Sequence, residues 1–344
     1  MTEFFITNNQ LKGIDHGMMP ETVIDIERYT RLILLHLEDW RPFFRKPLEV
    51  QAKWENELKN GLDDLSQSVI DRLLAFYRML MLAEKTMGKR IGRYDFLLNK
   101  DFFLFDEEVK TEEKVLAETV EIVKSVRFPQ EIEFMIDPYQ FGAEYGLKFV
   151  PKNKIDLREK DVIDGGGYCG DSALVFRIRS PRMIYTFEPN PTTFDLLKRV
   201  LQENQAENDV RPIAMALGTE SGTFPFYTND GVDYCAGLQF QHAKNRIDVP
   251  CTTIDHFVQE NDLRPGLIKL DIEGGEYEVL IGASETIRRF QPILLISVYH
   301  RASDFFEIKP FLERLYPAYR FVFRQMSFKW LNTETCLIAY PDGD

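Results

Sequence analysis

Four glycines stand close together where a short apolar run ends. The segment reads Asp161-Val162-Ile163-Asp164-Gly165-Gly166-Gly167-Tyr168-Cys169-Gly170-Asp171, and a helical pattern follows from Ser172 to Ile178. Glycine has no Cβ, so its backbone adopts positive φ angles and lets a ligand approach closely, and the start of a helix offers free N–H groups. The sequence therefore predicts a ligand site at the carboxyl end of this strand, as is usual in open α/β sheets.

Two carboxylates at strand ends indicate the kind of ligand. Asp164 stands in the turn itself, where a carboxylate suits a ligand with a positive ammonium group better than the pyrophosphate of NAD. Glu188 follows the next predicted strand, Met183–Phe187, where it can accept hydrogen bonds from both hydroxyls of a ribose. The pair favours S-adenosylmethionine over NAD. Asn190 either helps to shape the ribose site or caps the helix that starts at Pro191.

A second group of titratable residues follows two later strands. Asp271 and Glu273 come after Leu267–Leu270, and His300 comes after Ile293–Tyr299. If these strands are neighbours, about 4.8 Å apart, their end residues share one crevice. We expect His300 to act as a general base, because histidine titrates near neutral pH, and Asp271 to orient either His300 or the acceptor.

Other interpretations of these residues stay open. His300 is read equally well as a surface residue or a hydrogen-bonded core residue, and Glu276 is explained by the dipole of the helix that starts there. Glu273 fits either interpretation. Asp271, Glu273 and His300 are also plausible ligands for a divalent metal, but the sequence has no tight metal-ligand spacing, so it predicts no metal site.

The pattern of apolar residues divides the chain into three parts. From Pro20 to about Arg127 apolar residues recur at helical spacing, as in Val69, Leu73 and Phe76. We therefore expect a mainly helical N-terminal domain at residues 1–130. Short aromatic runs broken by proline and glycine then predict a β lead-in or connector at residues 131–157.

From residue 158 to residue 344 the sequence predicts an α/β domain. Apolar runs alternate with helical stretches there, which is typical of βαβ units and a mainly parallel sheet. The chain ends in two runs, Tyr319–Phe323 and Thr335–Tyr340, that an antiparallel pair would produce. The segment Tyr227–Asp248 is expected to form a loop or hairpin over the carboxyl edge. Its Tyr234, His242 and Arg246 either bind acceptor hydroxyls or have ordinary surface roles.

The aromatic residues of the helical part predict packing rather than a ligand site. They are expected to form a core or oligomer contacts, so a homo-oligomer through this domain is one possibility; they comprise Trp40, Phe43, Phe44, Trp54, Phe76 and Tyr77.

Composition excludes several classes of protein. The 344 residues include 55 acidic and 42 basic ones, for a net charge of −13, which argues against a surface that binds nucleic acid. The four cysteines show neither CxxC spacing nor a disulfide pattern. No run approaches the length of a transmembrane helix and no leader is evident, so a cytoplasmic protein is expected.

The motifs of the second half resemble those of the FkbM family of S-adenosylmethionine-dependent methyltransferases. The resemblance spans about residues 161 to 340 and rests on VIDGGGYCGDSAL, IYTFEPNPTTFDLL, AMALGTESG, LIKLDIEGGEYEVLIGA and PILLISVYH. It implies the class I methyltransferase fold, a Rossmann-like seven-stranded sheet with one antiparallel strand. It also implies a bound methyl donor and methyl transfer to oxygen, often a hydroxyl of a sugar or glycan-like metabolite.

The resemblance also assigns residues to the donor. Asp164, Gly166 and Gly170 would contact or border it, Glu188 would bind its ribose, and Ala216 and Leu217 would lie near the adenine. The sequence departs from the family at Tyr168, where Asn is usual, which leaves the contacts to the methionine end open. The full predicted donor site comprises Asp164, Gly165, Gly166, Gly167, Tyr168, Gly170, Asp171, Glu188, Asn190, Ala216, Leu217 and Asp271, and the predicted catalytic residues are His300, Asp271 and Glu273.

The sequence thus predicts an O-methyltransferase that acts on a small-molecule or glycan acceptor. Two alternatives remain: an NAD-dependent oxidoreductase, and a non-catalytic interaction protein with a degenerate methyltransferase domain. The carboxylate in the glycine turn argues against the first, and the presence of acidic residues at the first two strand ends argues against the second.

Overall fold

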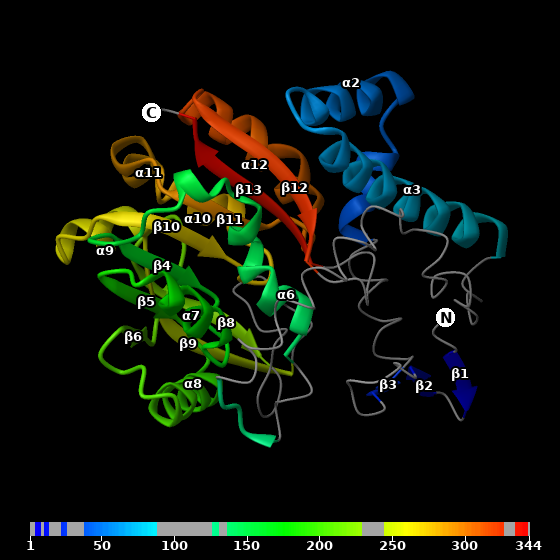
Figure 1. The fold of residues 1–344 in the computed structure, drawn as a ribbon. Helices are drawn as coiled ribbons and strands as arrows, with labels where there is room; N and C mark the ends of the chain where they lie inside the picture. The colour runs from blue at the N-terminus through cyan, green and yellow to red at the C-terminus, as the bar shows by residue number, and fades with distance from the viewer. Residues whose placement is uncertain are drawn as a thin grey trace.

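The computed structural model describes residues 4–7, 10–13, 22–25, 38–87, 126–130, 136–228, 244–326 and 334–342. Within these ranges the chain forms a central sheet covered by helices on both faces, with two further helices at one side (Figure 1). Residues 88–125 of the predicted helical domain lie outside the described residues, as do Tyr234, Cys235 and His242.

The central sheet has seven strands in the order β12-β13-β11-β10-β4-β5-β6. Only β13 runs antiparallel to its neighbours, β11 and β12, and the other pairs are parallel. The fold class implied by the resemblance is therefore confirmed. The strands are β4 (Asp161–Gly165), β5 (Met183–Phe187), β6 (Val210–Ile213), β10 (Pro265–Leu270), β11 (Ile293–Ser297), β12 (Tyr319–Gln325) and β13 (Thr335–Pro341).

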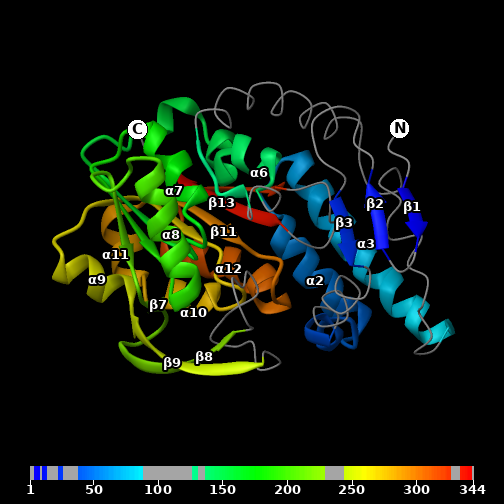
Figure 2. The same cartoon turned by 90° about the horizontal axis from the view of Figure 1, so that it is seen from below.

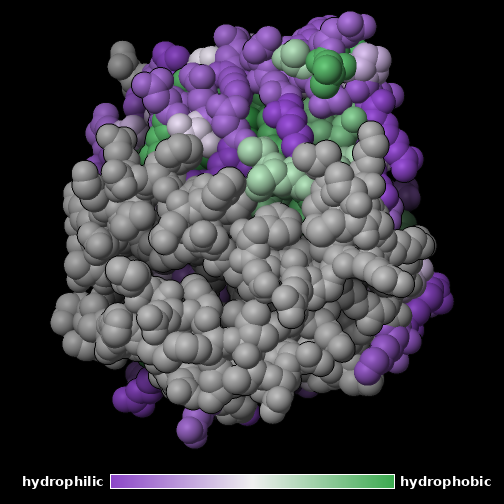
Figure 3. Space-filling view, turned by 90° about the vertical axis from the view of Figure 1, so that its right-hand side faces the viewer, coloured by the Kyte–Doolittle hydropathy of each residue, from purple (hydrophilic) through white to green (hydrophobic). Residues whose placement is uncertain are grey.

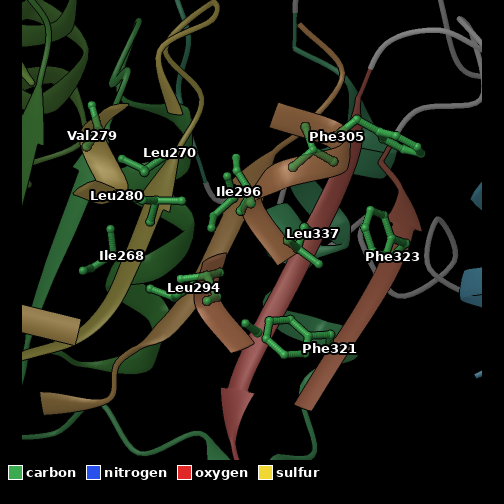
Figure 4. Packing of buried hydrophobic residues seen from close by; sticks show 14 of the residues in the cluster. Ile268, Leu270, Val279, Leu280, Leu294, Ile296, Phe305, Phe321, Phe323 and Leu337 are labelled. Atoms are coloured by element: carbon green, nitrogen blue, oxygen red, sulfur yellow. The ribbon is translucent and has the colours of Figure 1, made fainter. Parts of the chain in front are cut away.

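Alternate residues of the strands enter two separate cores. Ile268 and Leu294 face one layer of helices, whereas Leu267 and Leu295 face the other. Because successive side chains of a strand point to opposite faces, continuous apolar runs fill both cores. The first layer has α9 (Ile254–Glu260), α10 (Glu276–Ile281), α11 (Ser284–Phe290) and α12 (Ala302–Leu315), and the second has α6 (Pro138–Gly142), α7 (Asp171–Phe176) and α8 (Pro191–Glu203). Figure 4 shows the first core, where Leu294, Ile296 and Leu337 lie between the strands and the helices.

Caps and tight turns fix where the helices begin. Asn190 caps α8 by accepting a hydrogen bond from Thr192 N at 3.0 Å, and Pro191 follows at the first helical position. The capping role considered for Asn190 is thus confirmed. Thr253 caps α9 in the same way, through His256 N.

The β lead-in expected at residues 131–157 is wrong for the part that is described. Residues 138–142 form α6, and two 3-10 helices follow at Glu144–Phe149 and Lys152–Lys154. Asp137 accepts hydrogen bonds from Tyr139 N and Gln140 N, so this cap and Pro138 start a helix despite the aromatic residues that favour strands.

The apolar run at residues 210–217 is divided between two sheets. Its first half is β6, and its second half, β7 (Ala216–Leu217), belongs to a small sheet with β8 (Gly222–Thr228) and β9 (Asn245–Thr252) in the order β7-β9-β8. β8 and β9 form the expected hairpin, which runs below the other elements in the view of Figure 2. Arg246 is exposed there and pairs with Asp248 at 3.1 Å, which is an ordinary surface role.

The N-terminal helices pack on the edge of the sheet and share its core. These are residues 38–44, α2 (Leu48–Lys59) and α3 (Asp64–Met87). Trp40 stacks on Tyr77 with ring centroids 4.1 Å apart, and Phe43 stacks on Phe306 of α12 at 4.0 Å. The aromatic residues thus form a core, which is one of the two roles, core or oligomer contact, that the sequence predicts for them. Figure 3 shows this side of the molecule, where most of the described surface is hydrophilic.

Two backbone contacts connect these helices to the α/β part. Asp39 accepts a hydrogen bond from Ala302 N at 2.6 Å, and Ser66 accepts one from Phe323 N at 2.9 Å. Three short strands also occur near the N-terminus, so the region is not wholly helical; they are β1 (Phe4–Thr7), β2 (Gln10–Gly13) and β3 (Thr22–Asp25). Among the helices described, none is both long and apolar enough to cross a membrane.

The shared aromatic core yields a prediction about stability. Trp40→Ala removes a fully buried ring and leaves a cavity, so we expect the free energy of unfolding to fall by about 3–5 kcal/mol. Leu48→Ala is the control, because Leu48 is 80% exposed and its removal should change little. Urea unfolding measures both. A Trp40→Ala variant as stable as Leu48→Ala would show that the N-terminal helices contribute little to the common core.

Candidate active site

The glycine turn between β4 and α7 is packed against two other strand ends. Gly166 has a φ of +75°, and a Cβ there would lie 1.8 Å from the carbonyl oxygen of Asp271. A Cβ on Gly167 would lie 2.0 Å from Thr186 Oγ1. The amides of Gly166 and Gly167 both donate to Phe187 O, at 3.1 and 2.8 Å. Gly166 is thus required by the close approach of the Asp271 backbone and Gly167 by that of the Thr186 side chain, and the N–H groups of both are used within the protein.

Asp164 lies beneath this turn, fully buried. Its Oδ2 accepts hydrogen bonds from Ser172 Oγ and Thr186 Oγ1, each at 2.8 Å, and its Oδ1 lies 3.4 Å from Lys269 Nζ. We had expected this carboxylate to face the ammonium group of a ligand. In the structure it contacts protein groups instead, and it positions the turn from below.

Lys269 is a functional residue that the sequence analysis missed. Its Nζ donates to Gly166 O at 2.8 Å and to Gly165 O at 3.3 Å, so it joins β10 to the glycine turn. Burial opposes the charged ammonium, but the carboxylates of Asp164, Asp271 and Asp171 outweigh it and raise the pKa of Lys269. One signal was present in the sequence: Lys269 is the single charged residue within an otherwise apolar strand.

Glu188 ends β5 at the same edge and is held by two backbone amides. Its Oε2 accepts from Tyr168 N at 3.1 Å and its Oε1 accepts from Asn190 N at 2.8 Å. Burial raises the pKa of Glu188 to about 8, although both hydrogen bonds act in the opposite direction. Asn190 also donates to Thr228 Oγ1 at 2.9 Å, which connects this site to the β8–β9 hairpin.

The remaining residues of the predicted donor site lie around the turn. Asp171 accepts a hydrogen bond from the Tyr145 hydroxyl, and burial raises its pKa. Leu217 lies under Gly165, since a Cβ on Gly165 would be 3.0 Å from its Cδ1. Ala216 packs in a small cluster with residues of the β8–β9 hairpin. Gly170 has a φ of +87° at the start of α7, and Tyr168 adopts a left-handed φ of 43°.

Asp271, Glu273 and His300 come together as the strand order predicts. β10 and β11 are parallel neighbours, and the carboxyl ends of both strands lie at one edge. His300 Nε2 lies 3.6 Å from Asp271 Oδ1 and 3.6 Å from Glu273 Oε1, and the His300 side chain is only 4% exposed. These three residues, together with Glu276, form what we call the histidine cluster.

Glu276 contacts His300, whereas the sequence alone explains this residue by the dipole of the helix that starts there. It is fully buried, and its Oε1 lies 3.0 Å from His300 Nδ1. The same carboxylate accepts hydrogen bonds from Ile272 N at 3.0 Å and from Gly275 N at 2.9 Å. Glu276, rather than Asp271, therefore orients the imidazole ring through Nδ1. Burial opposes its ionisation, but the proximity of His300 lowers the pKa of Glu276 to about 2.

These carboxylates change the protonation state expected for His300. Burial disfavours the imidazolium ion, but Glu276 and Glu273 outweigh burial and raise the pKa of His300 well above 6.5. An imidazolium ion has no lone pair with which to accept a proton. The role of general base predicted for His300 therefore does not fit the cluster in this state.

A pocket opens beside the histidine cluster at the ends of β10, β11 and β13. Asp271 belongs to both, and the pocket is lined by Gln140, Tyr145, Lys269, Leu270, Asp271, Leu295, Ser297, Met326, Glu334 and Cys336. Glu334 accepts hydrogen bonds from Gln140 Nε2 at 2.9 Å and from the Tyr299 hydroxyl at 3.3 Å, and burial raises its pKa to about 8. The cavity is small, with room for about one water molecule, and amide, hydroxyl and carboxyl groups line it.

Comparison with known families tests the predicted resemblance. Residues 164–323 match the family model described as methyltransferase FkbM domain. Residues 164–323, just under half of the chain, are therefore similar to an FkbM methyltransferase domain. The matched range includes the glycine turn, Glu188 and the histidine cluster, and it ends within β12. The resemblance is thereby confirmed, and the match favours methyl transfer over the nicotinamide-dependent alternative.

Individual relatives of the FkbM domain are distant. The hexuronic acid methyltransferase AglP of Haloferax volcanii is 27% identical over 135 residues, which are 39% of this chain and 54% of AglP, so the match spans about half of that relative. The structure of methyltransferase FkbM from Methylobacillus flagellatus KT is 18% identical, with a TM-score of 0.44, over 68% of this chain and 60% of the other. An O-methyltransferase from Bacillus cereus in complex with SAH has 9% identity and a TM-score of 0.37, over 67% and 91% of the two chains.

The ion pair beneath the glycine turn of the FkbM domain yields a prediction. Lys269→Met leaves Asp164 buried without its cation, so the free energy of unfolding should fall by about 3–5 kcal/mol. Asp164→Asn combined with Lys269→Met should cost less than the sum of the two single variants, because the pair is removed together. Urea unfolding of all three variants measures the coupling.

The control for this cycle is Arg158→Met, which breaks the exposed pair with Asp156 and should leave stability close to wild type. Additive effects of Asp164→Asn and Lys269→Met would contradict the interpretation that the two charges form one unit.

Proposed function

We propose that this chain is an S-adenosylmethionine-dependent O-methyltransferase that methylates a hydroxyl group of a sugar or glycan-like acceptor. The observation that carries the proposal is the Glu188 carboxylate, which two backbone amides hold at the carboxyl end of β5. It lies beside the glycine turn within a methyltransferase domain. This combination suits an adenosyl ligand, because a ribose presents two adjacent hydroxyl donors.

The hydrogen-bonding capacity of Glu188 fits the ribose of this donor. A carboxylate has about four lone-pair sites, and the amides of Tyr168 and Asn190 occupy two of them. The two that remain match two hydroxyl donors. Leu217 and the glycines beside it offer an apolar surface next to this position. When bound, the donor supplies an electrophilic methyl group on a positively charged sulfur.

The pocket beside Asp271 suits the acceptor. Methyl transfer requires that the acceptor oxygen is aligned with the methyl group and that water is excluded, so positioning is the main task of the protein. Gln140, Ser297 and Glu334 line this cavity, which has room for about one water molecule, so side chains must move before a sugar hydroxyl can reach them. The name of AglP, a hexuronic acid methyltransferase, supports a carbohydrate acceptor.

Electrostatics favours a hydroxyl over a carboxylate as the methylated group. Asp271 and Glu273 lie at the end of β10, and Glu334 lies across the pocket from the strand ends. Asp271 and Glu273 would repel a carboxylate placed beside them, since charges in a partly buried site are poorly screened, whereas Glu334 keeps its proton near neutral pH and would not. A neutral hydroxyl meets no such penalty.

The raised pKa of Glu188 predicts how donor binding depends on pH. Without ligand, Glu188 keeps its proton up to about pH 8, whereas in the unfolded chain it loses the proton near 4.5. The free energy of unfolding of the free protein therefore falls as the pH rises through this window. Ribose hydroxyls bind the ionised form, so donor binding releases the proton. We expect the affinity for S-adenosylhomocysteine to rise by up to about tenfold per unit between about pH 6 and about pH 8.

Calorimetric titration across this pH range tests the prediction. Glu188→Gln should bind S-adenosylhomocysteine more weakly and with a flat pH profile, while Glu203→Gln at the end of α8 should behave as wild type. If Glu188→Gln keeps both the affinity and the slope, then Glu188 is not the ribose ligand.

The product of the reaction tests the acceptor. We expect transfer of labelled methyl from S-adenosylmethionine to sugars or oligosaccharides, and the label should survive mild alkali because a methyl ether is stable there. Alkaline release of labelled methanol from a hexuronic acid would instead indicate a methyl ester and overturn the assignment to a hydroxyl. Transfer to no carbohydrate, with S-adenosylmethionine bound, would remove the sugar from the proposal and leave the donor site standing.

A further inference from the structure

Two buried polar atoms of the histidine cluster face each other without a hydrogen bond. Within the described residues, neither Asp271 Oδ1 nor His300 Nε2 has a hydrogen-bond partner. They lie 3.6 Å apart, and the His300 side chain is 4% exposed. Most buried polar groups in proteins are hydrogen-bonded, and those that are not call for an explanation, such as an ion.

A third oxygen approaches the same nitrogen. Glu273 Oε1 lies 3.6 Å from His300 Nε2, as Asp271 Oδ1 does. In an octahedral site with bonds of about 2.1 Å, adjacent ligand atoms are separated by about 3.0 Å. Both distances from His300 Nε2 exceed this spacing by about 0.6 Å. Glu273 is not among the residues whose ligand atoms all lie within 4.8 Å of one another, so its side chain must move toward Asp271 to complete the site.

Glu276 belongs to the cluster but has a different role. One ligand atom each from Asp271, Glu276 and His300 lie within 4.8 Å of one another, so Glu276 is near enough to be considered as a ligand. Its oxygens, however, already bind His300 Nδ1, Ile272 N and Gly275 N. A carboxylate that binds Nδ1 and turns Nε2 toward a site is the usual outer partner of a metal-bound histidine.

We propose that Asp271 Oδ1, Glu273 Oε1 and His300 Nε2 bind one divalent cation, and that Glu276 holds the imidazole ring in place through Nδ1. The cation takes the place of the proton on Nε2, which is released to solvent, so that the lone pair of this nitrogen becomes available for the metal. Two carboxylates and one imidazole suit a cation such as Mn²⁺ or Mg²⁺, and a site with three protein ligands leaves coordination positions open. The sequence marks the same three residues as plausible ligands, but it predicts no metal site because it has no tight metal-ligand spacing. The cation explains why three carboxylates surround one histidine.

The position of this site connects it to the acceptor. Asp271 also lines the pocket, so a cation bound there can hold oxygen atoms of a polyhydroxylated acceptor in its open positions. It also offsets the negative charge of Asp271 and Glu273 next to the acceptor. This role depends on the proposed function, whereas the binding of the cation does not.

Titration with Mn²⁺, followed by electron paramagnetic resonance on the full chain without any donor, tests the site directly. We expect one tightly bound Mn²⁺ per chain in the wild type. Asp271→Asn and Glu273→Gln should each weaken binding by about tenfold or more. Asp195→Asn is the matched control, because Asp195 is exposed on α8, and it should bind as the wild type does.

A spectroscopic signature separates ligation by His300 from a general loss of negative charge. A coordinated imidazole gives ¹⁴N modulation of the Mn²⁺ spin echo, which should be present in the wild type and in Asp195→Asn and absent in His300→Gln. Thermal unfolding without metal checks that each variant folds; if His300→Gln does not, Glu273→Gln, whose side chain is 23% exposed, carries the test. Absence of bound Mn²⁺, or binding that neither Asp271→Asn nor Glu273→Gln weakens, overturns the proposal.

The outcome is independent of the donor site. S-adenosylhomocysteine binding, measured separately on the same samples, reports on Glu188 and the glycine turn. If the chain binds S-adenosylhomocysteine but does not bind Mn²⁺, the cation site is wrong and the methyltransferase proposal stands. If it binds Mn²⁺ but does not bind S-adenosylhomocysteine, the cation site stands and the donor site is wrong.

Discussion

The buried contact between Lys269 and Asp164 joins β10 to β4 at the point from which the loops of the site depart. Neither charge would be tolerated alone at this depth, because burial of an unpaired ion is costly. The ammonium lies 3.4 Å from one carboxylate oxygen and donates to two carbonyls of the glycine turn, while Ser172 and Thr186 donate to the other carboxylate oxygen. The turn is therefore fixed from below, and this in turn fixes the amide of Tyr168 that holds Glu188.

The glycine turn lies between Glu188 and the histidine cluster and contacts both. The α-carbon of Gly166 lies so near the Asp271 carbonyl that no side chain fits between them. Asp271 begins the loop that carries Glu273, which holds a left-handed φ of 63° that residues other than glycine rarely adopt. On the far side, Asp39 binds the amide of Ala302 two residues after His300. The N-terminal helices thus help to hold the cluster although they contribute no residue to it.

The sequence predicted the structure best where a feature depends on a single property of its residues, such as the apolar character of a strand. Alternating apolar runs predicted the order of strands and helices, and the strand ends predicted that Asp271, Glu273 and His300 meet. Local capping was harder to predict: at residues 136–157 Asp137 and Pro138 started a helix where aromatic residues favoured strands. Contacts made across the sheet were not predictable. Lys269 reads as one charge in an apolar run, and its partners come from residues a hundred positions away.

The region around Glu188 and the region around His300 both contain several acidic side chains. Glu188 and Glu334 have pKa values raised to about 8 by burial, so in the free protein both retain protons near neutral pH, and His300 carries a positive charge among its carboxylates. Protons therefore mask part of the charge that the residues would otherwise carry. A site of this kind gains free energy when a positively charged or hydroxyl-rich ligand replaces those protons, and it loses free energy when an anion enters. The same residues that cost stability in the free fold thus favour the cationic donor and the neutral, polar acceptor that we propose.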